Sequence, residues 1–383
     1  MFIPLLQVLG AVSAAATVAS IGYCVLATVA GLRFASSRRH PRPIPGGLPP
    51  VSILKPLKGA DPEMYEALHS HCLQDYPEYE ILCGVTASDD PAVPVVERLI
   101  REFPRVNIQL LLCDKRLGAN GKVSTLIQLA AAAKSEYLLV NDSDIRVERD
   151  YLRTVISELQ QPDVGLVTCL YRGAPSPTLG SRLEALGIST DFMPGVLSAS
   201  LIEGGIHFGL GSTLAFRKAD LDAIGGFGAI ADYLADDYEL GRRIAERNKV
   251  RLSAAVVETH LPAYDLREFI SHQLRWARTI RASRPGGYAG LLLTFTLPWA
   301  IATMALWRSK IAIILFATAL LGRGVMAFVS SRVVLRERGV AFLGLLPIRD
   351  LIAASVWLGG LLGNTITWRG EKFLLKDGKL TRK

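Results

Sequence analysis

The chain has no charged residue between Pro4 and Leu32. A run of this length is long enough to cross the roughly 30 Å hydrocarbon core of a bilayer as a helix. A cleaved signal peptide is the alternative. It is disfavoured because no basic residue precedes the run, and because the run exceeds the roughly 7–15 apolar residues of such peptides. We therefore expect a transmembrane helix over residues 1–32.

Paired cysteines are also absent. The five cysteines are scattered without any C-x-x-C spacing, at Cys24, Cys72, Cys83, Cys113 and Cys169. This argues against a disulfide framework or a zinc site and suits the reducing cytosol. The sequence contains no internal repeat and no low-complexity tract.

The chain is basic and apolar overall. It has 383 residues and a net charge of +8, and its mean hydropathy of +0.29 is high for a soluble enzyme. Basic residues lie beside the apolar segments, as Arg33, Arg38 and Arg39 do. We therefore expect membrane lipids, not nucleic acid, as partners. The positive-inside rule places the N-terminus outside and the following domain in the cytoplasm.

After a basic, Pro/Gly-rich linker at residues 33–50, short apolar runs alternate with helix-like segments. This alternation predicts a mostly parallel α/β sheet, in a domain over residues 51–285. The expected strands cover residues 51–54, 80–85, 108–112 and 137–140, and the expected helices cover residues 64–72, 94–103 and 123–133. The interrupted apolar stretch 179–206 is expected to be an amphipathic element that faces the membrane or an acceptor groove.

Residues 286–368 contain further apolar segments. Leu291–Leu306 and Ile311–Ser330 are expected to span the membrane, and Leu351–Ile366 is a third candidate. Arg323 lies inside the second segment, where an ionisable side chain needs a partner or an interface position. Three crossings would leave the basic tail, residues 369–383, outside, which the positive-inside rule disfavours. One segment is therefore expected to be re-entrant or interfacial.

Charged residues follow the expected strands. Lys55 and Lys58 lie on the turn after the first strand, Asp89-Asp90 follow the second, and Asp142-Ser143-Asp144 follow the fourth. Ligands of open α/β sheets bind at the carboxyl ends of the strands. We therefore expect these groups to converge on one site.

Asp142 and Asp144 have the spacing of a metal–diphosphate motif. Mg²⁺ and Mn²⁺ prefer oxygen ligands, and one or two carboxylates together with substrate phosphates complete the coordination. Such a metal offsets charge on a departing diphosphate. D-x-D also occurs by chance in surface loops, but its position after Leu-Leu-Val favours the functional interpretation.

The earlier charged residues allow two interpretations. Asp89 and Asp90 either cap a helix or contact the base and ribose of a nucleotide. Lys55, Lys58 and Lys122 either pair with phosphates or are simply solvated.

Asp236-Asp237 open a helix-like segment. Carboxylates in a first turn are favoured by the helix dipole, so capping is the plain interpretation. The functional one makes Asp237 a general base, because attack by an alcohol needs a group that removes its proton.

His272, Arg275 and Trp276 lie in a basic segment that runs to Arg284. It is typical of an amphipathic helix at a membrane surface. Arg275 is also suited to clamp a diphosphate, and Trp276 to stack on the acceptor or sugar. Both interpretations can hold, each for a different face of the helix.

These motifs together resemble the ceramide-glucosyltransferase-like family of the inverting GT-A superfamily, which includes cellulose and chitin synthases. The resemblance covers roughly residues 50–285. The matching segments are Val51–Gly59, Gln74–Pro77, Asp89–Ala92, Asn141–Val147, Ala235–Tyr238 and Arg275-Trp276. The resemblance implies a GT-A fold, a UDP-sugar donor bound by Asp89 and Asp90, and a divalent metal and diphosphate bound by Asp142 and Asp144. It also implies Asp237 as the base.

Within that family, Leu166–Gly173 and Leu274–Arg281 look most like bacterial hopanoid-biosynthesis enzymes. This likeness implies UDP-N-acetylglucosamine, bacteriohopanetetrol and a bacterial inner membrane. Transfer to ceramide is the alternative, since it uses the same catalytic residues. The superfamily has Gln or Arg where this chain has His272, and Gln there goes with processive synthases. Its absence favours a single transfer. A membrane protein that binds nucleotide without turnover is disfavoured, because no catalytic carboxylate is missing.

Overall fold

The computed structural model describes residues 2–38, 47–338, 341–368 and 371–382. They form two compact units. The helical unit comprises Met1–Arg39, Pro177–Ile202 and Ala263–Ile366, and the sheet unit comprises His40–Ser176, Glu203–Pro262 and Thr367–Lys383. Part of the expected linker, residues 39–46, lies outside the described residues.

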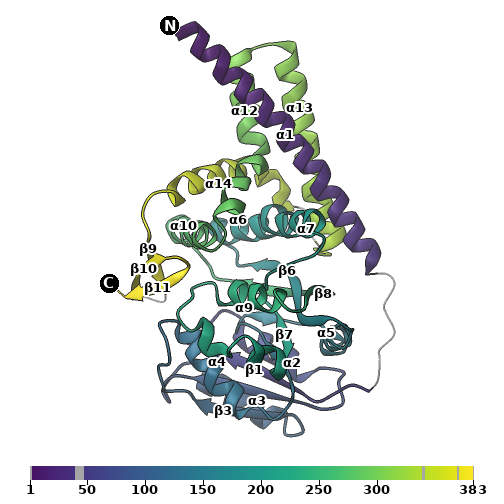
Figure 1. Cartoon of the computed structure of the whole chain (residues 1–383), viewed down its shortest axis with the longest axis vertical. Helices are drawn as coiled ribbons and strands as arrows, with labels where there is room; N and C mark the ends of the chain where they lie inside the picture. Colours follow the sequence, from purple (N-terminus) through teal and green to yellow (C-terminus); the bar gives the residue numbers. More distant parts are fainter. Residues whose placement is uncertain (1, 39–46, 339–340, 369–370, 383) are drawn as a thin grey trace. The chain divides into compact units, whose positions relative to one another are not determined.

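An eight-stranded sheet forms the core of the sheet unit (Figure 1). Its strands, in spatial order, are β3 (Asn107–Leu112), β2 (Tyr79–Val85), β1 (Val51–Pro56), β4 (Tyr137–Val140), β7 (Leu214–Arg217), β6 (Val164–Pro175), β8 (Lys249–Leu261) and β5 (Ile145–Arg146). β1 is parallel to β2 and β4, β2 to β3, and β6 to β8. β7 is antiparallel to both its neighbours, and β5 is antiparallel to β8. The predicted mostly parallel α/β sheet is confirmed.

Helices pack on this sheet. α4 contacts β1 and β2, α5 contacts β6, β7 and β8, and α9 contacts β6 and β8. All six residues of β1 are buried, as expected of a parallel strand with both faces covered. The helices of the unit are α2 (Met64–Cys72), α3 (Val93–Glu102), α4 (Gly121–Ala132), α5 (Tyr151–Leu159), α8 (Lys218–Ala223), the 3₁₀ turn η2 (Phe227–Ile230) and α9 (Asp236–Ala245).

The basic tail is folded. β10 (Glu371–Lys376) and β11 (Lys379–Arg382) form a hairpin, which joins β9 (Thr365–Trp368) in a three-stranded sheet. β9 begins where the third apolar segment was expected to continue. The expected helix over Leu351–Ile366 is therefore wrong at its C-terminal end, since α14 (Leu346–Gly360) ends before it.

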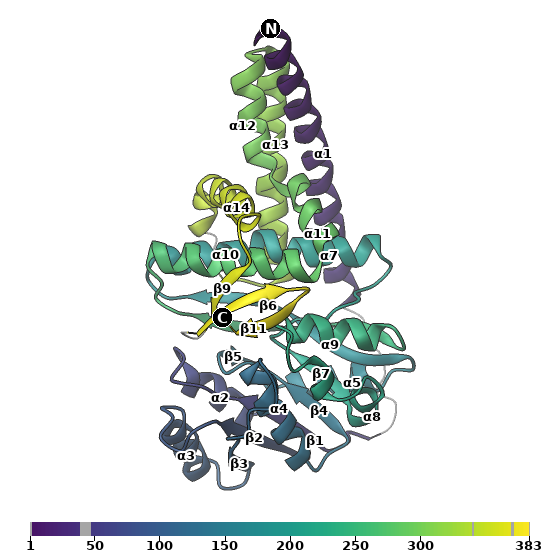
Figure 2. The ribbon, with the colours of Figure 1, turned by 60° about the vertical axis from the view of Figure 1, so that its left-hand side comes forward.

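The helical unit contains long apolar helices. α1 (Phe2–Ser37), α12 (Thr296–Trp307) and α13 (Lys310–Phe328) lie side by side (Figure 2). Many of their large apolar side chains are exposed, which is typical of helices that face lipid. The unit also contains α10 (Leu266–Ser283), α11 (Pro285–Gly290), η3 (Leu291–Thr294), η4 (Val329–Val334) and η5 (Ala341–Leu345).

Within the part of the chain that the structure describes, four helices are long and apolar enough to cross a membrane: Leu5–Ser37, Leu179–Ile202, Lys310–Val334 and Leu343–Gly360. A further pair, Pro285–Thr294 and Thr296–Trp307, is bent by 54°. The apolar stretch 179–206, expected to be an interrupted amphipathic element, contains one helical stretch, made of α6 (Leu179–Gly187), the π-helical turn η1 (Ile188–Phe192) and α7 (Met193–Ile202).

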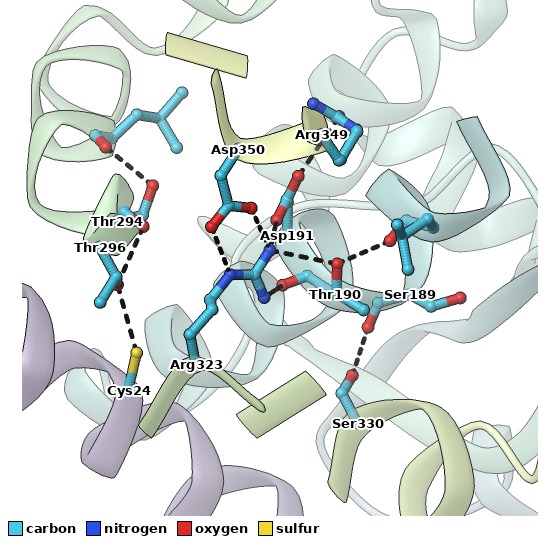
Figure 3. A network of polar contacts seen from close by, with 12 residues as sticks. Cys24, Ser189, Thr190, Asp191, Thr294, Thr296, Arg323, Ser330, Arg349 and Asp350 are labelled. Carbon is cyan, nitrogen blue, oxygen red and sulfur yellow. Dashed lines mark hydrogen bonds and ion pairs between the residues drawn. The ribbon is translucent and has the colours of Figure 1, made fainter. Parts of the chain in front are cut away.

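Arg323 of α13 has the partners that its position in an apolar helix requires (Figure 3). Its guanidinium donates to Asp350 at 2.7 and 2.9 Å and to the Thr190 carbonyl at 2.9 Å. It also donates to Asp191 at 2.5 Å. Thr190 and Asp191 lie on the π-helical turn, and Asp350 lies on α14. One buried side chain therefore joins three helical elements.

Candidate active site

The D-x-D turn follows β4 and is anchored by buried polar groups. Asn141 is fully buried, and its amide nitrogen donates to the Ser212 carbonyl at 2.6 Å and the Tyr151 hydroxyl at 2.9 Å. Lys55 Nζ donates to the Asp142 carbonyl at 3.1 Å. Strand β4 and these contacts fix the backbone that carries Asp142 and Asp144.

The two lysines after the first strand have different positions. Lys55 is fully buried in β1, and burial lowers its pKa to about 7. Its contact with the Asp142 backbone gives it a role in supporting the turn. Lys58 is exposed on the following loop, where its ammonium is accessible to a ligand.

Lys122 joins the two acidic motifs. Its Nζ lies 2.7 Å from Asp142 Oδ1 and 3.4 Å from Asp236 Oδ2. Burial would lower the pKa of this ammonium, but Asp142 and Asp236 outweigh burial and raise the pKa above its usual value. Lys122 lies in the first turn of α4 because Asn120 caps that helix, accepting a hydrogen bond from Val123 N at 3.2 Å.

Asp144 lies in a strongly acidic environment. Burial and the neighbouring Asp142 carboxylate raise its pKa to about 6. The Thr259 hydroxyl of β8 donates to Asp144 Oδ2 at 2.6 Å, and the Ser143 hydroxyl donates to Asp61. Asp61 adds further negative charge near Asp144 and contributes to its raised pKa.

Asp236 and Asp237 begin α9, as the sequence predicts, and their side chains have different neighbours. Asp236 faces Lys122 and accepts a hydrogen bond from the Asn120 amide at 3.4 Å. Asp237 faces Gly211: a β-carbon at that glycine would lie 3.0 Å from Asp237 Oδ2 and 3.3 Å from Asp142 Oδ2. Burial and Asp236 raise the pKa of Asp237 to about 6.

Asp89 and Asp90 follow β2 at the same edge of the sheet. Asp90 Oδ1 accepts hydrogen bonds from Gly59 N and Ala92 N, both at 2.9 Å. Asp90 therefore ties the Lys58–Gly59 loop to Ala92, the N-cap residue of α3, but α3 has no side-chain cap hydrogen bond. Asp89 is exposed.

His272, Arg275 and Trp276 lie on α10 of the helical unit. His272 Nδ1 is 2.9 Å from an oxygen of Glu184, a residue of α6 that is 2% exposed. The His272 ring lies 5.4 Å from both the Tyr264 and Trp276 rings. His272 therefore belongs to an aromatic cluster with Tyr264 and Trp276, and its imidazole also contacts the buried carboxylate of Glu184.

The donor set fits a divalent cation of the Mg²⁺ or Mn²⁺ type. Asp142 and Asp144 present hard carboxylate oxygens, and burial together with the neighbouring Asp142 carboxylate raises the pKa of Asp144. Among the residues that the structure describes, no group of three or more His, Cys, Asp or Glu side chains could hold a metal. Mg²⁺ is usually bound through one or two carboxylates together with substrate phosphates.

Several residues that lie beside the predicted ones within each unit were not predicted from the sequence: Asp61, Asn120, Glu184, Gly211 and Thr259. Asn120 had a local signal, because an Asn before a run of helix formers is a typical N-cap. The others had none, since each meets its partner only through the fold.

The chain is similar to known proteins over most of its length. The family model for "Glycosyl transferase family 21" matches residues 12–381. Ceramide glucosyltransferase 3 of Caenorhabditis elegans is 26% identical over 352 residues, which are 86% of this chain and 74% of that protein. The ceramide glucosyltransferase of Komagataella phaffii is 37% identical over 147 residues, 36% of this chain and 29% of that protein.

A solved mannosyltransferase from Pyrobaculum calidifontis, in complex with GDP-Man and Mn²⁺, has a similar fold. Its TM-score is 0.55 at 21% identity, covering 92% of this chain and 99% of that one. The predicted GT-A fold is thereby confirmed. Because the family model spans nearly the whole sequence, this chain belongs to glycosyl transferase family 21 and is a glycosyltransferase.

Proposed function

We propose that this enzyme transfers one sugar from a UDP donor to the hydroxyl of a membrane lipid, with inversion, and that the lipid is a ceramide. The carrying observation is that Asp142, Asp236 and Asp237 meet around Lys122 and Gly211 in a chain with long apolar helices. The relatives named ceramide glucosyltransferases support the ceramide alternative over the hopanoid expectation. The hopanoid expectation rests on two short motifs alone.

Asp142 and Asp144 would hold the divalent metal, which when bound would offset the negative charge of the departing diphosphate. Lys122 lies against Asp142 and supplies a second positive charge there. Lys58 is accessible to the phosphates. Asp90 fixes the loop that carries Lys58, and exposed Asp89 is suited to a ribose hydroxyl.

Asp237 is the proposed base. The acceptor hydroxyl attacks the anomeric carbon, the bond from that carbon to the diphosphate oxygen breaks, and the hydroxyl proton passes to Asp237. A pKa of about 6 keeps this carboxylate ionised at neutral pH and makes it a better proton acceptor than an ordinary Asp. Attack opposite the leaving group gives a β-linked product.

The motif on α10 is proposed to serve the acceptor. Trp276 and Tyr264 flank His272 and offer apolar ring faces, while Glu184 orients the imidazole. Arg275 is suited to a diphosphate or an anionic lipid.

The fold also restricts the membrane crossings. Ser176 donates to the Leu261 carbonyl and Ile206 pairs with Val250, so both flanks of the Leu179–Ile202 helix belong to the sheet unit. Because a polar unit lies on one side of a membrane, we propose that this single helix does not cross.

The same reasoning applies to the C-terminal part. The chain leaves the sheet unit after Pro262 and returns to it at Thr367, so the crossings between these points are even in number. We propose that α1, α13 and the bent pair of Pro285–Thr294 with α12 cross, and that α14 lies at the interface. The basic C-terminal residues then share the cytoplasmic face with the sheet unit, as the positive-inside rule favours, in a bacterial inner membrane.

The test is purified full-length protein incubated with a panel of UDP-sugars, Mn²⁺, and either ceramide or hopanoid polyols, with products identified by mass spectrometry. Glycosylated ceramide at neutral pH is expected, and it should disappear with Asp237→Asn. Glycosylated hopanoid with untouched ceramide would overturn the acceptor assignment. Turnover that survives Asp237→Asn would remove Asp237 as the base.

A further inference from the structure

We infer that the C-terminal hairpin of β10 and β11 is a positioning element of the active site, whose outer edge fixes the segment preceding Asp236 and Asp237. This inference rests on the proposed function, because it assigns the hairpin to the site of sugar transfer. From the sequence alone, these residues were predicted only to be a basic tail.

The turn of the hairpin determines which N–H groups of β11 point outward. Asp377 and Gly378 have φ values of 51° and 77°, the combination of a two-residue type I′ turn. Lys376 pairs with Lys379, and Leu375 with Leu380. Hydrogen-bonded and non-bonded pairs alternate along an antiparallel ladder, so the N–H of Leu380 points away from β10.

That outward edge binds residues 232–234. Leu380 N donates to the Asp232 carbonyl at 2.8 Å, and Leu234 N donates to the Gly378 carbonyl at 3.1 Å. Tyr233 and Lys379 form an antiparallel bridge between these two bonds. The hairpin thus extends along the segment that leads into α9.

The hairpin is packed as well as hydrogen-bonded. Phe373, Leu375 and Leu380 are 2–4% exposed, so the hairpin has an apolar face buried within the protein. Lys379 Nζ lies 5.2 Å from the centroid of the Tyr233 ring. These contacts are those of an integral element of the sheet unit.

The same segment contacts the loop that carries Lys122. Asn120 N donates to the Ala231 carbonyl at 2.8 Å, and the Asn120 amide donates to the Tyr233 carbonyl at 2.8 Å. Asp232 accepts a hydrogen bond from Ala119 N at 2.9 Å. Residues 231–234 therefore connect the hairpin edge both to the loop before Lys122 and to the start of α9. Loss of the hairpin would loosen the positions of Lys122, Asp236 and Asp237 together.

The first experiment compares Leu380→Pro with the wild-type enzyme. Proline removes the N–H donated to Asp232 and spares the bonds between β10 and β11. We expect kcat to fall at least tenfold and the KM for the UDP-sugar to rise. A role in stability alone would lower the amount of folded enzyme and leave this KM unchanged. Lys376→Ala, at the exposed position opposite Lys379, is the matched control and should behave as wild type.

The second experiment covers the case in which Leu380→Pro does not fold. Tyr233→Cys combined with Lys379→Cys places two thiols at the bridged pair, where a disulfide locks the hairpin in place. Turnover in the oxidised form at the level of the reduced form supports the inference. Loss of turnover on oxidation, restored by reduction, would show that the hairpin must leave and would overturn it.

Failure of the proposed function and failure of the hairpin inference give different results. If the wild-type enzyme forms no glycolipid, the proposed function fails. If the wild type turns over and folded Leu380→Pro matches it in kcat and in KM, only the hairpin inference fails.

Discussion

Gly211 offers the sharpest test of the site, because two carboxylates face the position of its missing side chain. In Gly211→Ala the new β-carbon would lie 3.0 Å from Asp237 Oδ2 and 3.3 Å from Asp142 Oδ2. Ordinary van der Waals contact needs several tenths of an ångström more at the closer oxygen. One or both carboxylates must therefore move, and the methyl group also removes solvation from them.

The magnitude follows from the two displaced groups. Overpacking by one methyl group costs about 1–3 kcal/mol, and misplacement on the order of 1 Å costs up to about a hundredfold in rate. We expect kcat to fall about 10- to 100-fold, which corresponds to about 1.4–2.7 kcal/mol in the activation free energy. The unfolding midpoint should fall by only a few degrees, since the change lies at the edge of the sheet.

The assay is initial-rate glycolipid formation at saturating donor and acceptor, with thermal unfolding measured on the same samples. Gly205→Ala is the matched control, because it lies in the same segment before β7 and its β-carbon would meet nothing within 4 Å. Wild-type kcat in Gly211→Ala would refute the view that Asp142 and Asp237 act together at this point.

Three further predictions concern the charges of the two units. Lys122→Met should lower turnover about a hundredfold or more, with partial recovery in Lys122→Arg, because its ammonium joins Asp142 to Asp236; steady-state rates of both variants check this. Turnover should fall about tenfold per pH unit below about pH 6, since Asp237 must be ionised to accept a proton and its pKa is raised to about 6; a pH–rate profile with a flat acid limb would contradict this. Arg323→Met should destabilise the protein by about 3–5 kcal/mol by leaving Asp350 buried without its partner, and Asp350→Leu in that background should restore part of the loss; denaturant unfolding in detergent measures both.

Local patterns in the sequence determined much of the framework. Val51–Leu54 and Tyr137–Val140 are short apolar runs bounded by polar residues, and both are buried strands. Because parallel strands end at one edge, their spacing placed Asp142 and Asp144 at that edge before any contact was known. Asp236 begins a helix for an equally local reason, the preference of carboxylates for a helix N-terminus.

The partners of those residues depended on the tertiary structure. Lys55 looked like a phosphate ligand, yet its side chain is buried against the Asp142 carbonyl, because a strand directs alternate side chains to opposite faces and only the assembled sheet decides what covers each face. Arg323 clearly needed a partner, and Asp350 meets it through helix packing.

The basic tail also shows which properties follow from composition and which follow from the fold. Its lysines and arginines marked it as polar, which composition alone can establish. Its pairing with residues 232–234 depends on two segments more than a hundred residues apart in the chain meeting in the folded sheet unit. Local sequence sets where a strand, helix or charged turn lies, whereas only the folded chain decides which of many distant groups comes close enough to bond to it.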